Sequence, residues 1–93
     1  MTNKTFEISD KYRRHFGYFL EENYESFQVK EYGECHSIYD MNNVALIPKH
    51  NNLKHPPGIV SITFIGTEEN IENVINNLEK TLKMQLKDLS VTK

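Results

Sequence analysis

The feature that most constrains the fold is a strand-forming segment followed at once by an amphipathic helical segment. Residues 58–65, GIVSITFI, are rich in β-branched and aromatic side chains and alternate as a strand does. Gly66 ends this pattern, Thr67 can cap a helix, and a continuous apolar stripe at helical spacing follows. The members of that stripe are Ile71, Val74, Ile75, Leu78 and Leu82. We therefore expect a strand and then a helix that packs its stripe on a sheet.

The charges of this second helix agree with its macrodipole. Glu68 and Glu69 begin it, and Lys80 and Lys83 lie near its end. The more apolar face of the strand, which carries Val60, Ile62 and Phe64, is expected to meet the helices.

The rest of the chain predicts a first helix and several shorter strands. Residues 10–23 place apolar side chains near helical spacing after Ser9, a suitable N-cap. Residues 27–39 alternate as two strands or one bent strand, before the turn-forming DMNN. Further strands are expected at residues 5–8, at residues 44–47, where Pro48 should end the strand, and at residues 84–92, where a prolonged helix is the alternative.

This order predicts one α+β domain over residues 1–93. We expect a small ferredoxin-like sandwich, with two helices packed on one face of a mainly antiparallel sheet. In layout alone this resembles small ligand-sensing domains of the ACT type and the metal-sensing halves of some bacterial regulators. No family motif accompanies the layout, so it assigns no residue a role.

Composition narrows the classes of partner. Among 93 residues, 11 Lys and Arg stand against 13 Asp and Glu, a net charge of -2, which disfavours nucleic acid and anionic membranes as partners. No segment approaches the ~18 apolar residues of a membrane-spanning helix. The single cysteine, Cys35, allows no internal disulfide, so we expect a cytoplasmic protein. Frequent Asn, Lys, Ile and Glu favour a bacterial or phage origin.

Four residues could in principle hold a transition metal such as zinc or nickel: Cys35, His36, His50 and His55. Their spacing argues against it, because no cysteine pair is present and consecutive strand residues point to opposite faces. We expect no cofactor, and we interpret the loop over residues 48–58 as a polar turn stiffened by two prolines. Cys35 beside His36 is also the one candidate nucleophile and base, and no catalytic signature surrounds it.

The first helix carries basic residues in its first half and carboxylates at its end. The helix dipole disfavours carboxylates there, so these residues suggest a purpose other than helix stability, such as an acidic docking patch. A plain solvated helix end is the alternative and the commoner explanation. One exposed aromatic among the cations does not make a nucleic-acid platform. We predict a partner-binding set that comprises Arg13, Arg14, Tyr18, Glu21, Glu22 and Glu25.

Three classes of function follow. The first is a non-enzymatic module that acts through protein–protein contact, either with itself as a dimer or as a regulator or inhibitor of a larger partner. The alternative is a ligand- or metal-sensing regulatory domain of ACT-like layout, and the third is a small enzyme that uses Cys35 and His36.

Overall fold

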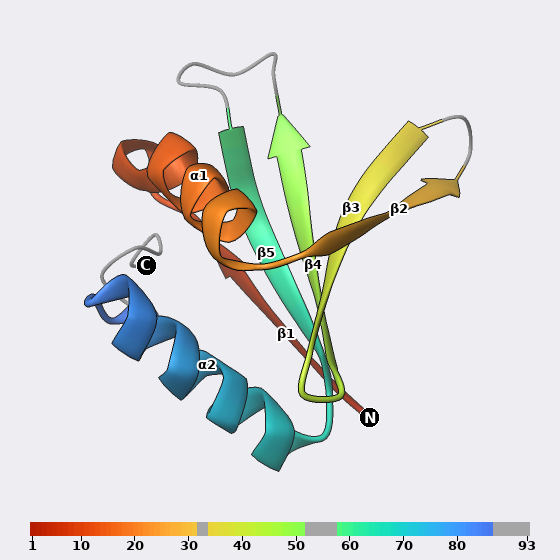
Figure 1. Cartoon of the computed structure of the whole chain (residues 1–93), viewed down its shortest axis with the longest axis vertical. Coiled ribbons are helices and arrows are strands. Elements are labelled where there is room, and N and C mark those ends of the chain that lie inside the picture. The colour runs from red at the N-terminus through yellow and green to blue at the C-terminus, as the bar shows by residue number, and fades with distance from the viewer. Residues whose placement is uncertain (32–33, 52–57, 87–93) are drawn as a thin grey trace.

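The computed structural model describes residues 1–31, 34–51 and 58–86. An open antiparallel sheet of five strands, in the order β1-β5-β4-β3-β2, carries two α-helices on one face (Figure 1). In chain order the elements are β1 Thr2–Glu7, the 3-10 helix η1 Asp10–Tyr12, α1 Arg13–Asn23, β2 Ser26–Glu31, β3 Glu34–Met41, β4 Val44–Asn51, β5 Gly58–Gly66 and α2 Glu68–Leu82. The α+β class and the placement of both helices on one face of the sheet are therefore confirmed.

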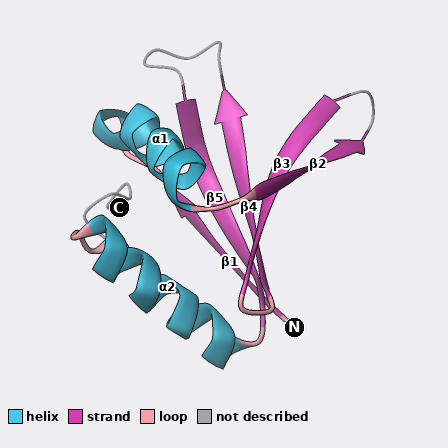
Figure 2. Cartoon of the chain, in the orientation of Figure 1, coloured by secondary structure: helices cyan, strands magenta, loops and turns pink. Residues whose placement is uncertain are grey.

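The connectivity differs from the β-α-β-β-α-β order of ferredoxin-like domains. Strands β2 to β5 run as neighbours in an antiparallel meander before α2. Strand β1 pairs with β5 and forms the edge of the sheet opposite β2 (Figure 2). Strand β1 confirms the prediction at residues 5–8 and begins earlier. Residues 84–86 are not in a strand, and the remainder of the predicted 84–92 segment lies outside the described residues.

Helix α2 forms as its sequence predicts. The Thr67 side chain accepts a hydrogen bond from the Asn70 N–H at 3.2 Å, and Lys83 ends the helix in the left-handed conformation at φ 63°. Its stripe packs on the sheet through Ile71, Val74 and Leu78, all of which are buried. The cap and the stripe are both local signals, so this helix can be predicted from its own sequence, while burial of the stripe on the sheet stabilises it.

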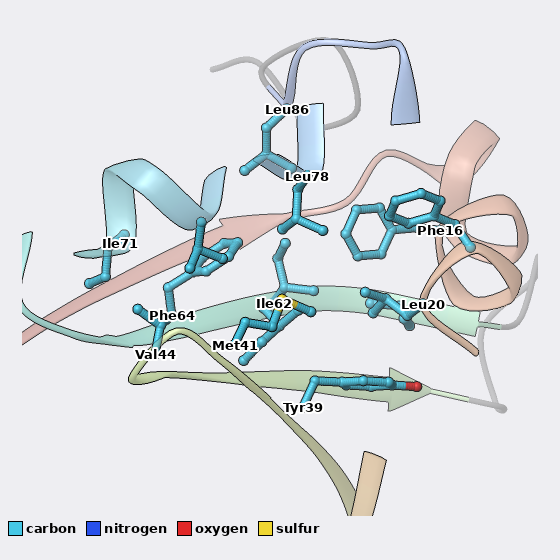
Figure 3. Packing of buried hydrophobic residues seen from close by; sticks show 14 of the residues in the cluster. Phe16, Leu20, Tyr39, Met41, Val44, Ile62, Phe64, Ile71, Leu78 and Leu86 are labelled. Atoms are coloured by element: carbon cyan, nitrogen blue, oxygen red, sulfur yellow. The ribbon is translucent and has the colours of Figure 1, made fainter. Parts of the chain in front are cut away.

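The core lies between the two helices and the sheet (Figure 3). Phe16 and Leu20 of α1 and Leu78 of α2 converge there with Ile62 and Phe64 of β5. Every one of these five side chains is at most 2% exposed. Burial of such large apolar side chains, at roughly 1.5–3 kcal/mol each, is what binds both helices to the sheet.

An irregularity between β4 and β5 changes which strand residues face the helices. Ile59 pairs with His50 and Ser61 pairs with Lys49, so Val60 is an extra residue in β5. Ile59 is consequently 1% exposed, whereas Val60 is half-buried. The predicted face is correct for Ile62 and Phe64 and wrong for the first part of the strand, because one extra residue reverses the alternation.

Strand β4 continues through Pro48, so the prediction that it ends there is wrong. In the described pairings β3 accompanies β4 over Val44–Leu46, while β5 pairs with it through Pro48 and beyond. Pro48 therefore lies where β4 has a neighbour on one side, which is the edge-like position that tolerates a missing N–H. The turn before β4 is as predicted, with Asn42 and Asn43 at φ 47° and 64°, the positive values that a type I′ hairpin requires.

The first helical segment is divided rather than continuous. A 3-10 turn at Asp10–Tyr12 precedes α1, and the Ser9 side chain makes no capping hydrogen bond. The Arg13 guanidinium contacts the Asp10 carboxylate at 2.6 Å, three residues earlier. Side chains three apart align in a 3-10 turn, so this ion pair suits the tighter geometry.

Two glycines lie where α1 crosses β5, and they differ in how much room a side chain would have. Gly58 has φ +135°, and a Cβ there would lie 2.9 Å from the backbone carbonyl of Arg13. A Cβ on Gly17 would meet only the Ile59 side chain, at an ordinary 3.8 Å from Cδ1. The close backbone contact at Gly58 thus fixes the start of α1 against the start of β5, whereas Gly17 leaves room above the strand.

We expect Leu78→Ala to lower the free energy of unfolding by about 2–5 kcal/mol, because it opens a cavity in the core. Ile75→Ala should cost less, since Ile75 is half-buried beside the core. Urea denaturation of both variants, with Asn76→Ala as an exposed control, measures the difference. Equal small losses, below about 0.5 kcal/mol, would show that the stripe is not core.

The two glycines predict opposite responses to alanine. Gly58→Ala should destabilise by about 1–3 kcal/mol, through the strained φ and the contact with Arg13. Gly17→Ala should stabilise by about 0.5–1 kcal/mol through its better helix propensity. Thermal and urea unfolding compare the two variants directly, and a stabilising Gly58→Ala would contradict the backbone contact described above.

Candidate functional site

A shallow cleft lies between α1 and the adjoining ends of β4 and β5. Its volume is about 210 Å³, and it opens broadly to solvent. Helix α1 contributes Arg13, Arg14, Gly17, Tyr18 and Glu21. The strands contribute His50, Gly58 and Ile59.

The floor of the cleft exists because α1 has no side chain at Gly17. Ile59 lies beneath this position, close enough that a Cβ on Gly17 would be in van der Waals contact with it. Since Gly58 brings the start of β5 against Arg13, the helix and the strand meet at one end of the cleft. The two glycines and the buried Ile59 therefore shape the site.

Arg13 forms one end of the cleft and is held in place. Its side chain is 11% exposed, and its ion pair with Asp10 occupies one side of the guanidinium. This residue lines the cleft as part of its wall. Its predicted role in binding a partner stays a prediction. Its burial and its ion pair with Asp10 indicate that it helps to hold the start of α1 in place.

Arg14, Tyr18 and Glu21 form the exposed surface beside the cleft, which we call the α1 strip. They are spaced four and three residues apart, so they project from one side of the helix. Tyr18 is 61% exposed, and it is the one exposed large aromatic side chain in the part of the chain that the structure describes. Together with Arg13, four of the six residues that the sequence predicted therefore line the cleft. Glu22 and Glu25 are exposed but do not line the cleft.

The charge order of α1 is the reverse of what its dipole favours. Its first turn holds no acidic residue and its last turn holds no basic one; instead Arg13 and Arg14 begin it, and Glu21 and Glu22 lie near its end. Helix α2 of the same chain has the favourable order, with Glu68 first and Lys80 last. The charges of α1 therefore do not stabilise this helix through its dipole, as those of α2 do.

Glu21 also acts on a buried tyrosine of the sheet. Tyr39 of β3 is 4% exposed, and its pKa is raised above the usual 10.0, first by burial and then by the negative charge of Glu21. A hydrogen bond with the Ser26 side chain offsets part of this rise in pKa. The carboxylate at the acidic end of the cleft thus lies within electrostatic reach of the core.

The predicted metal residues are only partly described. His50 lies in β4 and lines the cleft, while Cys35 and His36 are consecutive residues of β3 whose side chains fall outside the described part of the structure. His55 lies outside the described residues altogether. Among the side chains that are described, no three His, Cys, Asp or Glu residues gather in a way that could hold a metal ion.

Sequence reasoning identified the exposed side chains of the cleft and missed the residues that shape it. In the sequence Gly17 lies off the apolar stripe of its helix, but its role in the cleft depends on Ile59, 42 positions away. Gly58 follows two prolines and reads locally as a turn residue. Both roles depend on the crossing of α1 over β5.

Compared with known proteins, the chain matches no protein-family model, no curated protein and no solved structure at a significant level. Within the described residues, neither helix is long and apolar enough to cross a bilayer.

The raised pKa of Tyr39 predicts a stability change in alkali. Above pH 10 the folded protein retains the phenolic proton of Tyr39 while the unfolded chain loses it. The contribution of this group to the free energy of unfolding is therefore fully present below about pH 10 and is lost as the pH rises towards the raised pKa. Tyr39→Phe has no phenolic proton, so its stability should not show this pH dependence. We expect the difference in unfolding free energy between wild type and Tyr39→Phe, measured in urea, to be constant up to about pH 10 and to move in favour of the variant above it. A difference independent of pH would contradict the assignment.

Proposed function

We propose that this protein is a non-enzymatic binding module that acts through protein–protein contact, and that the α1 strip and its cleft are the contact surface. The observation that carries the proposal is an open cleft bordered by an exposed Tyr and an exposed Arg, on a helix whose charge order disfavours its own stability. A role as a regulator or inhibitor of a larger partner, and a cytoplasmic setting, belong to the same proposal.

The size of the cleft favours a protein partner over a small ligand. Pockets for small molecules usually enclose about 300–1,000 Å³ and cover most of the ligand. The cleft here is smaller, at about 210 Å³, and open. Such a depression suits one side chain inserted from a partner's surface, and it offers a ligand sensor of ACT-like layout little enclosure.

The residue types of the α1 strip support the same conclusion. Tyr and Arg are, with Trp, the residues most enriched where a few side chains dominate binding energy. Arg14 has no ion pair with any residue that the structure describes, so its charge is available to steer an approaching partner. Glu21, two turns away, adds the opposite charge and so fixes the orientation of whatever binds.

The test places a photoreactive phenylalanine analogue at Tyr18 and, as a control, at the exposed Glu72 of α2. We expect crosslinking to one protein species from position 18 and none from position 72. Introducing Arg14→Glu with the analogue at position 18 should lower the yield about tenfold at low salt, and raising the salt should reduce the difference. Lys80→Glu on α2 makes the same charge change away from the cleft and should have no effect.

Equal crosslinking from positions 18 and 72, or yields that Arg14→Glu leaves unchanged at low salt, would remove the α1 strip from the contact surface. Circular dichroism of each variant verifies that the fold is intact.

A further inference from the structure

We infer that the partner of the α1 strip is a second copy of this chain, bound with the two α1 helices antiparallel about a two-fold axis. This inference rests on the proposed function and names its partner. In such a pair Arg14 of each copy faces Glu21 of the other, and each Tyr18 enters the other copy's depression at Gly17.

The reversed charge order of α1 is the first reason. Alone, α1 has its cations at the positive end of its dipole and its carboxylates at the negative end. An antiparallel neighbour brings the carboxylates of each helix to the cationic first turn of the other. Both the side-chain charges and the two helix dipoles are then complementary, so an arrangement that is unfavourable within one copy becomes favourable between two.

Symmetry and spacing give the second reason. A two-fold interface must be self-complementary, so that a residue i contacting j implies j contacting i. Arg14 and Glu21 are seven residues apart, which places them on the same side of α1 about 10.5 Å apart along the axis. An axis midway between them pairs both opposite charges at once. The same axis falls between Gly17 and Tyr18.

The shape of the cleft agrees with that axis. At its centre α1 carries the largest exposed aromatic side chain of the described residues next to its smallest residue. In the two-fold pair each Tyr18 ring lies over the opposite Gly17, where the depression is floored by Ile59. A protruding ring and an adjacent depression are what a self-complementary surface requires.

The contact is small, because α1 has 11 residues. A single pair of crossing helices of this length buries less than the ~1,200–2,000 Å² of a standard interface. We therefore expect a reversible dimer with a dissociation constant on the order of 100 μM at low salt, weakened as salt rises.

Sedimentation equilibrium of the full chain, over micromolar to millimolar protein, provides the test. Wild type should move from monomer to dimer. Arg14→Glu and Glu21→Arg should each weaken dimerisation about tenfold or more, because each homodimer would then hold two like-charge contacts. An equimolar mixture of these two variants should restore association to within about threefold of wild type, since every contact regains opposite charges. Tyr18→Ala should weaken dimerisation about tenfold without rescue by either partner.

Matched controls on α2, Lys80→Glu and Glu72→Arg, change the net charge equally and should dimerise as wild type does. A wild type that stays monomeric throughout overturns the inference. So does a dimer indifferent to Arg14 and Glu21, or a mixture that associates no better than its components. If the wild type is monomeric yet crosslinks from position 18 to another protein, the proposed function stands and the second copy is excluded as the partner. If neither occurs, both proposals fail.

Discussion

The whole structure depends on the packing of β5. This strand pairs with β1 on one side and β4 on the other, and it presents Ile59, Ile62 and Phe64 to the helices. Both α1 and α2 pack against it. Because apolar burial is the main favourable term in folding, a strand that gives three buried side chains to both helices fixes their positions together. The extra residue at Val60 is part of this design, since it turns Ile59 towards α1 and so makes the floor of the cleft.

The two helices are stabilised in different ways, and their charges show the difference. In α2 the side-chain cap, the acidic first turn and the basic last turn all favour the helix, and its exposed face carries no exposed aromatic side chain among the described residues. In α1 the N-terminal cap makes no side-chain hydrogen bond and the charges oppose the dipole. Helix α1 is instead held by tertiary contacts, through Phe16 and Leu20 in the core and Gly58 against its first turn. Packing thus supplies the stability that the local signals of α1 do not, and the outer surface of α1 takes no part in it.

This division explains how a small domain can keep a helix whose charges oppose its own dipole. Natural proteins retain locally unfavourable features mostly where function requires them, and the rest of the fold supplies the compensating stability. Here the compensation comes from the core side of the same helix, one turn away from the charges concerned. The α1 strip and the apolar stripe of α1 are therefore two faces of one element, and changes on the outer face should leave the fold intact.

What the sequence alone determined was whatever depends on near neighbours in the chain. The helix at Glu68–Leu82, the Asn42–Asn43 turn, the apolar stripes and the exposed α1 strip follow from periodicity, capping and turn chemistry, which act over a few residues. Local sequence did not predict four other features: the strand order, the passage of β4 through Pro48, the extra residue at Val60 and the cleft. Each arises from contacts between residues distant in the chain: which strand lies beside which, and where α1 crosses β5. Only the tertiary structure decides these, because a residue's partners across the sheet determine whether a missing N–H, an extra residue or an absent side chain is tolerated.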